Sequence, residues 1–241
     1  MRNFIPSGLL HLSILTMAVM TSAASGQTRS QVYGGTLTQQ TQTAFFAADV
    51  GFQTYESESV ESKDTSPAYN YRVGGFAGED RVLGVFANIA DSTTPFELNE
   101  SRIRTAWRDL AIQYRLGFLY PTVYATSSEL TLTAEGVEDI HIFGTGFGAG
   151  LAVQVPITKQ IIVQADAKSI NTASAHDRYG AEVDVGRRDE AELSASVDLV
   201  ERYVDLIVGY RYRNYDLTIE DTKSVETQTT PFGGLRLGLY F

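Results

Sequence analysis

Apolar and polar residues alternate one by one along ten stretches of this chain. In residues 44–55, for example, Phe46, Val50 and Phe52 fall on one face, while Asp49 and Gln53 fall on the other. A period of two residues indicates a β-strand with one apolar and one polar face. The predicted strands are residues 44–55, 68–77, 81–90, 104–118, 123–134, 141–155, 160–169, 189–200, 204–215 and 230–241.

Short and long connections follow these stretches in turn. Tight turns are expected at residues 78–80, 119–121, 156–159 and 201–203, and longer polar loops at 56–67, 91–100, 170–188 and 216–226. Strands of about ten residues, an even strand number and turns that alternate in length are typical of barrels that cross a membrane. The pattern therefore predicts an all-β fold, a transmembrane antiparallel up-and-down β-barrel of ten strands. Eight strands is the alternative, if the threonine-rich stretch 123–134 and a neighbour lie outside the membrane.

The two ends of the chain support this interpretation. Residues 1–26 have the features of a cleaved signal peptide: a positive Arg2, an apolar run from Leu9 to Met20, and small residues near Ala24. Residues 27–43, rich in Thr and Gln, are expected to form a periplasmic leader segment, and residues 44–241 the barrel. The chain contains no cysteine, so it has no disulfide framework.

The last stretch resembles the C-terminal targeting strand of bacterial outer-membrane β-barrels. Leu235, Leu237, Leu239 and Phe241 alternate with small or polar residues, and Phe241 ends the chain. Together with the signal peptide, this ending makes the chain similar to small outer-membrane barrels, those of the outer-membrane protein A membrane domain and the surface-antigen-like families. The resemblance implies location in the Gram-negative outer membrane and assembly by the barrel-insertion machinery. It further implies contact with outer-membrane lipid and lipopolysaccharide, and roles in envelope integrity, adhesion or limited permeation.

Charged residues of both signs fall on the non-apolar faces of the predicted strands. An eight- to ten-stranded barrel has an interior that side chains largely fill, and paired charges are tolerated there. We therefore expect a structural charge network in the lumen, the space enclosed by the barrel, and not a selectivity filter. The predicted network consists of Asp49, Arg72, Asp109, Arg115, Asp166, Lys168, Asp198, Asp205, Arg211, Arg213 and Arg236.

Two alternatives to a filled, non-enzymatic barrel remain open. The first is a small, porin-like diffusion channel, for which the glycines between Gly144 and Gly150 would form an unobstructed wall. The second is an outer-membrane protease or lipopolysaccharide-modifying enzyme, for which His176 and Asp177 are the candidate pair in the predicted loop 170–188. A solvated loop is the simpler interpretation of that pair, and His141 is simplest as an interfacial residue, so we predict no catalytic residue.

Composition limits the remaining functions. The formal net charge of −10 argues against nucleic-acid binding, which calls for a basic face. Neither His141 nor His176 has a Cys or Glu at metal-ligand spacing, so no metal and no cofactor is expected. We expect a monomer with a side-chain-filled lumen, whose surface or structural role depends on its external loops.

Overall fold

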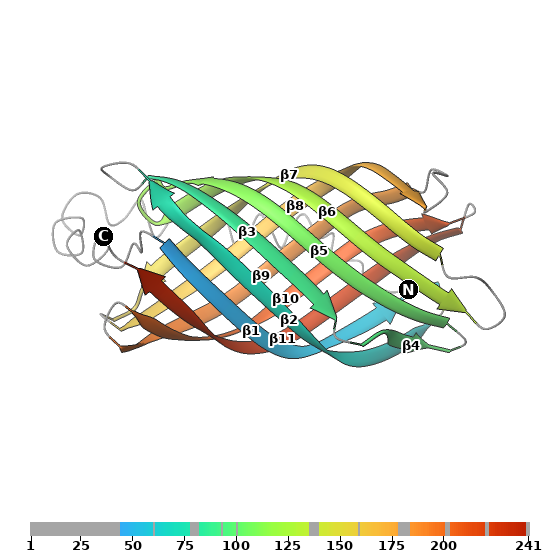
Figure 1. Cartoon of the computed structure of the whole chain (residues 1–241), viewed down its shortest axis with the longest axis horizontal. Helices are drawn as coiled ribbons and strands as arrows, with labels where there is room; N and C mark the ends of the chain where they lie inside the picture. Colours follow the sequence, from blue (N-terminus) through green and yellow to red (C-terminus); the bar gives the residue numbers. More distant parts are fainter. Residues whose placement is uncertain are drawn as a thin grey trace, which may run out of the picture. The chain divides into compact units, whose positions relative to one another are not determined.

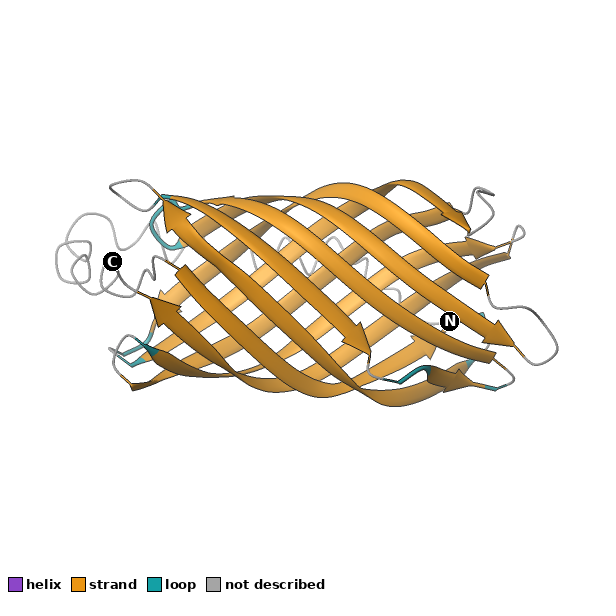
Figure 2. Ribbon diagram, viewed as in Figure 1, coloured by secondary structure: helices purple, strands orange, loops and turns teal. Residues whose placement is uncertain are grey.

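The structure is a computed structural model that describes residues 44–59, 61–77, 82–92, 94–99, 101–134, 140–158, 160–177, 184–200, 203–219 and 222–239. All of them belong to one compact unit, Gln42–Phe241. The predicted signal peptide, the leader segment and Phe241 lie outside the described residues. The regular elements within those residues are all strands (Figure 2), and no helix among them is long and apolar enough to cross a membrane.

Tilted antiparallel strands wind around a closed barrel (Figure 1). They are β1 (Ala44–Ser57), β2 (Ser62–Ala77), β3 (Leu83–Ser92), β4 (Phe96–Leu98), β5 (Ser101–Tyr114), β6 (Leu119–Ala134), β7 (Ile140–Pro156), β8 (Ile161–Asp177), β9 (Asp184–Val200), β10 (Val204–Ile219) and β11 (Thr222–Leu239). Strands that are neighbours in sequence pair with each other, except β3 and β4, which both pair with β5. Strand β1 closes the barrel against β11, where Ala44 lies opposite Leu239. The end with this pair is the terminal end; the opposite end is the far end.

Strands β3 and β4 are two parts of one barrel strand. Both run antiparallel to β5, with Asp91 of β3 opposite Ala106 and Phe96 of β4 opposite Ile103. Pro95 separates them, and proline cannot donate a ladder hydrogen bond. Next to this proline, the hydroxyl groups of Thr94 and of Ser66 on β2 form a hydrogen bond, with 2.6 Å between the two oxygens. The predicted ten-stranded barrel is thus confirmed, and the eight-stranded alternative is excluded.

Most strands are longer than predicted, and most connections are shorter. Residues 123–134 lie within the 16-residue β6, and β7, β8 and β9 have 17 residues each. The prediction of a loop at residues 170–188 was wrong, because β8 continues to Asp177 and β9 begins at Asp184. Loops 56–67 and 216–226 were also too long, since β1 ends at Ser57 and β11 begins at Thr222. The turn expected at 119–121 lies earlier, at 115–118, where Gly117 has a φ of 64° that favours glycine.

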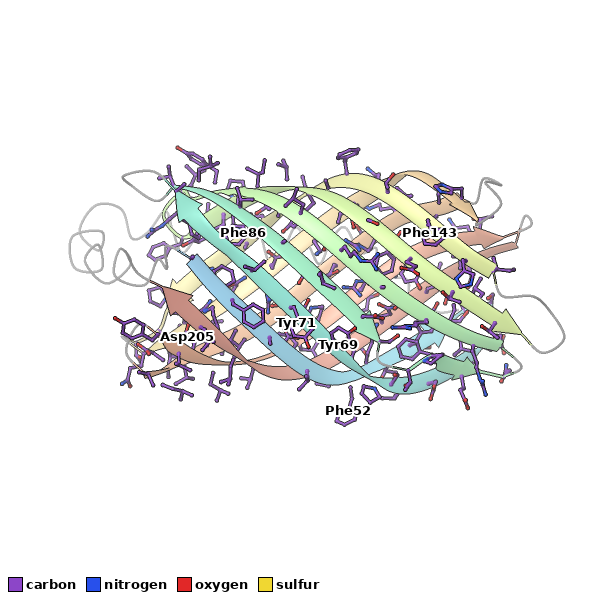
Figure 3. All side chains as sticks on the ribbon, in the orientation of Figure 1. Phe52, Tyr69, Tyr71, Phe86, Phe143 and Asp205 are labelled. Atoms are coloured by element: carbon purple, nitrogen blue, oxygen red, sulfur yellow. The ribbon has the colours of Figure 1, made fainter. Side chains whose placement is uncertain are left out.

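Apolar side chains form a belt around the outer face in the terminal half of the barrel. On β5, Leu110, Ile112 and Tyr114 are each about half exposed on this face, and Phe52 of β1 points away from the barrel wall (Figure 3). On β10, the outward positions from Val204 to Tyr212 all belong to this apolar belt. A stretch of that length gives a height of about 20–25 Å at the usual strand tilt. That height matches the apolar band of a transmembrane barrel.

Above the apolar belt the pattern reverses. Next along β5, Arg108 and Arg104 point outward, and each is half exposed, whereas Trp107 and Ile103 point inward and are buried. The far end therefore has a polar outer wall and an apolar interior, like a water-soluble protein. Its interior, the far-end core, consists of Tyr55, Ala90, Phe96, Leu98, Ile103, Trp107, Leu130, Ile142, Ala175, Val185, Tyr215 and Leu217.

Candidate functional site: the filled lumen

A layer of paired charges crosses the lumen directly below the far-end core. Asp109 of β5 accepts from Lys168 Nζ over 2.7 Å and from Arg188 Nη2 over 2.6 Å. The Thr126 hydroxyl of β6 donates to the same carboxylate. Lys168 and Arg188 come from β8 and β9, which are separated from β5 by β6 and β7, so these bonds cross the interior. All three charged side chains are buried.

A second group of charges adjoins the first. Glu192 of β9 accepts hydrogen bonds from Arg211 Nε over 2.9 Å and from Arg72 Nη1 over 3.0 Å. Arg72 of β2 also reaches Asp49 Oδ2 of β1, at 3.3 Å. Glu190 accepts from Arg213 Nε over 2.7 Å and lies 3.2 Å from Lys168 Nζ. These pairs, in which only Arg72 is partly exposed, are named together the charged layer. They connect strands β1, β2, β5, β8, β9 and β10 through the lumen.

Trp107, a member of the far-end core, borders the charged layer. The guanidinium carbon of Arg188 lies 4.6 Å from the centre of the Trp107 ring, and that of Arg213 lies 5.2 Å from it. The Trp107 ring also meets the ring of Tyr215, another member of the far-end core, edge-on, with 5.2 Å between ring centres. Arginine stacks favourably on an aromatic face, so one side chain joins the ionic and the apolar parts of the interior.

The terminal end of the lumen is filled differently. Phe45, Phe76 and Phe86 form a terminal-end aromatic cluster, with ring centres 5.6 Å apart for Phe45 and Phe86 and 5.3 Å for Phe76 and Phe86. Beside it, Arg236 donates from Nε to Asp205 over 2.7 Å. The lumen thus contains clusters of side chains at three levels.

The remaining predicted network residues take separate positions. Asp166 lies directly opposite Glu192 across the β8–β9 ladder, and Asp198 directly opposite Asp205 across β9–β10. Like charges at such positions repel each other. One carboxylate of each pair accepts a hydrogen bond from an arginine: Glu192 from Arg211, and Asp205 from Arg236. Arg115 lies beyond the end of β5, in the turn at the terminal end, where its backbone amide donates to the Val82 carbonyl. It is therefore not part of the charged layer.

Sequence reasoning missed three members of the charged layer. Arg188 was placed in the wrongly predicted loop 170–188, although it is buried in the lumen. Glu190 and Glu192 were assigned to the polar face of their strand but left out of the network. Their alternation with Ala191 and Leu193 carried the signal, and counting charges on that face would have found them.

The glycines of β7 do not leave an open wall. Their missing side chains give room to residues of the neighbouring strands. A Cβ on Gly150 would lie 2.8 Å from Lys168 Cβ and 3.0 Å from the Tyr124 ring, and one on Gly148 would lie 2.6 Å from Ile170 Cγ1. The Lys168 ammonium also lies 5.1 Å from the Tyr124 ring centre. Neighbouring side chains therefore occupy the space against this wall.

The two described histidines lie on the outer wall. His176 is exposed on β8, with its ring centre 6.4 Å from that of Phe143 on β7. His141 Nδ1 is within 3.2 Å of the Thr131 hydroxyl. Asp177 ends β8, but its side chain is outside the described set. Among described residues, no group of three or more His, Cys, Asp or Glu is placed to hold a metal ion.

The predicted assembly signal lies on the closing strand. Leu235 and Leu237 of β11 are about half exposed on the apolar belt. They pair with Ala48 and Phe46 of β1, at the seam that closes the barrel. The side chain of Leu239 and all of Phe241 fall outside the described residues, so their role stays a prediction.

No protein-family model matches the sequence, and no curated protein matches it by sequence. Solved structures do resemble the fold. The outer-membrane protease OmpT from Escherichia coli matches 83% of this chain and 98% of its own, with 9% identity and a TM-score of 0.50. The transport unit of the autotransporter AIDA-I from Escherichia coli matches 85% and 92%, with 10% identity and a TM-score of 0.49. Neisserial surface protein A matches 81% and 97%, with 12% identity and a TM-score of 0.43.

OmpT is an outer-membrane protein, and its likeness to this chain confirms the expected resemblance to outer-membrane barrels at the level of fold. At 9% identity, the likeness to OmpT concerns the fold alone. The chain has the fold of a closed ten-stranded outer-membrane β-barrel.

Proposed function

We propose that the protein is a sealed, non-enzymatic barrel of the outer membrane with a structural or surface role. The observation that carries this proposal is the filled lumen: the far-end core, the charged layer and the terminal-end aromatic cluster lie across it in succession. A ten-stranded barrel is also narrow compared with porins of sixteen or more strands, which keep an aqueous channel. Solutes therefore have no ready path through the interior.

The apolar belt and the sequence at both ends support the outer-membrane location. A belt of about 20–25 Å fits a bilayer core, and above it the polar outer wall of the far end would face the outside of the cell. Signal-peptide export, insertion by the barrel-assembly machinery and contact with lipid and lipopolysaccharide follow from this placement. Because the apolar far-end core stiffens the protruding wall, the far end is a rigid surface for envelope integrity or adhesion.

The outward position of His176 supports a non-enzymatic role. A hydrolytic site needs a histidine beside an acid and a nucleophile or an activated water. His176 instead contacts Phe143 on the outer wall, and its side chain is exposed to solvent. The charged residues of the lumen lie on the other side of the barrel wall.

A liposome-swelling assay with a small sugar tests the sealed lumen, with a sixteen-stranded porin as the positive control. We expect no swelling above that of protein-free liposomes. A peptide-cleavage and lipopolysaccharide-modification assay tests the enzyme alternative, and we expect no turnover. Sugar-dependent swelling would favour the channel, and turnover that disappears in His176→Ala would favour the enzyme.

A further inference from the structure

A groove runs along the outer face of the closing strand β11, within the apolar belt. Pro231 and Gly233 continue the outward alternation of Leu235, and neither has a side chain that rises far above the strand. Beyond its chain neighbours, a Cβ on Gly233 would have no atom nearer than 3.9 Å, whereas one on Gly209 would lie 2.6 Å from the Phe232 ring. The outer face is therefore open above Gly233.

Larger side chains of the two neighbouring strands form the sides of this groove, named the seam groove. Val50 of β1 and Val208 of β10 both lie opposite Gly233. Tyr210 of β10 lies opposite Pro231. Strands β1 and β10 are two strand spacings apart, about 10 Å. The space left between their side chains therefore has the width of one hydrocarbon chain.

The exposure of the side chains on β1 reflects this opening. Val50, which faces Gly233, is 67% exposed, whereas Phe46, which faces Leu237, is 45% exposed. Phe52, the next outward residue after Val50, is 66% exposed and points away from the barrel wall (Figure 3). These side chains stand beside a strand that does not cover them, in the part of the barrel that faces lipid.

A row of hydroxyl groups lies at the far-end border of the seam groove. Thr229 is the next outward residue of β11 beyond Pro231, and it lies opposite Thr54 of β1 and Tyr212 of β10. The Tyr212 hydroxyl also accepts from Asn214 Nδ2 over 3.3 Å. These neutral groups adjoin the apolar belt, so they suit the ester and amide linkages that join acyl chains to a head group.

Pro231 also leaves a backbone acceptor within the apolar belt. The pairing of β1 with β11 is interrupted at Phe52 and Gln53, and proline has no N–H to donate to the facing Phe52 carbonyl. No water is present in a bilayer core to satisfy such a group. A hydroxyl group on an acyl chain can donate to it. Lipopolysaccharide carries hydroxylated acyl chains, whereas ordinary phospholipids do not.

We propose that the seam groove binds one acyl chain of lipopolysaccharide. This inference rests on the proposed function, which places the far end outside the cell, where lipopolysaccharide forms the outer leaflet. The chain lies over Gly233 and Pro231, its hydroxyl donates to the Phe52 carbonyl, and its linkage reaches the row of hydroxyl groups. Contact on three sides gives the chain more van der Waals partners than a convex surface does, and such packing decides association where lipid is the solvent.

Binding is measured with the refolded barrel in detergent, so the result does not depend on where the protein resides in the cell. An environment-sensitive dye on Thr227→Cys, the next outward position beyond Thr229, reports on the border of the groove. Purified lipopolysaccharide should change the dye emission saturably, and a diacyl phospholipid should not. Gly233→Leu fills the groove and should abolish the change, yet it should fold, because the space above Gly233 is open. Ala149→Leu, on the exposed outer face of β7, is the matched control and should keep the change.

Native mass spectrometry of the same samples should show one lipopolysaccharide per barrel in the unmodified protein and none in Gly233→Leu. An emission change that persists in Gly233→Leu, or that phospholipid produces equally, would overturn the proposal. Loss of a dimer in Gly233→Leu, without loss of a lipid, would assign the groove to a second copy of the chain and would also overturn it. A barrel that binds lipopolysaccharide in detergent but is absent from the outer membrane would contradict the proposed location and not the groove.

Discussion

Arg188 lies over the face of Trp107, with its guanidinium carbon 4.6 Å from the ring centre. This contact marks the level at which the interior changes from charged to apolar. Near the same level the outer wall changes from apolar to polar, between Leu110 and Arg108 on β5. Both changes have one cause, which is the replacement of lipid by water outside the barrel. Below this level the barrel hides its charges inside, and above it the barrel hides its apolar side chains inside.

The far-end core should contribute to stability as the core of a soluble protein does. Phe96 is fully buried there and stacks on Tyr55 with 5.0 Å between ring centres. We expect Phe96→Ala to lower the free energy of unfolding by about 3–5 kcal/mol. Phe143→Ala, on the water-facing wall at the same end, is the matched control and should cost much less. Urea unfolding in detergent measures the free energy of unfolding of both variants. Equal losses of this free energy in the two variants would contradict an apolar far-end interior.

The charged layer should be sensitive to the loss of one partner. Asp109→Asn leaves Arg188 buried without its carboxylate and Lys168 with Glu190 alone, so we expect a loss of about 3–5 kcal/mol in the free energy of unfolding. The control is Asp189→Asn, because Asp189 pairs with the exposed Arg187 on the outer wall at 2.8 Å. A surface pair of that kind contributes at most about 1 kcal/mol. A loss at Asp109 no larger than that at Asp189 would mean that the layer is open to water.

Cysteine labelling can locate the border of the apolar belt on β5, since the chain has no cysteine of its own. In intact cells, Arg104→Cys should react with a membrane-impermeant maleimide, because this position lies on the polar outer wall. Ile112→Cys should stay unlabelled, because it faces lipid. Both should react after denaturation, which controls for expression. Failure of Arg104→Cys to react in intact cells, with normal labelling after denaturation, would reverse the proposed orientation.

The closing strand predicts a role for the last residue in assembly. Leu235 and Leu237 lie on the apolar belt at the seam with β1, and Phe241 continues their alternation in the sequence. We expect deletion of Phe241 to lower the amount of protein in the outer membrane, while refolding of the purified chain into detergent changes little. Outer-membrane fractionation and heat-modifiability on gels measure the two effects. Normal membrane levels of the shortened chain would refute this role.

The sequence predicted the strands well where lipid surrounds them. Leu110, Ile112 and Tyr114 alternate with Asp109 and Gln113, and the rule that apolar residues face outward gives the correct orientation there. The same rule fails above the apolar belt, because water makes the polar face the outer one. Ile170 and Arg188 are both buried in the lumen, yet their stretches were assigned to a polar loop. A reversal of the alternation along one strand is the signal that would have extended β8 and β9.

Pairings within the lumen could not be predicted from the sequence at all. Asp109 and Arg188 are distant in the chain and come from strands on different sides of the barrel, so their 2.6 Å contact depends on strand number and register. Alternation reports which face a side chain occupies, but it does not report which strand lies across the lumen. The break between β3 and β4 was also hidden, since Pro95 suggested a loop and not an interrupted strand.

Single-channel recording in a planar bilayer tests the sealed lumen most directly. The filled lumen predicts that the unmodified protein shows no steady conductance, because the far-end core, the charged layer and the terminal-end aromatic cluster narrow the path in series. Arg211→Ala, which removes a buried side chain bonded to Glu192, should raise the frequency of transient openings. A large, steady conductance in the unmodified protein that Arg211→Ala leaves unchanged would contradict the account and favour a diffusion channel.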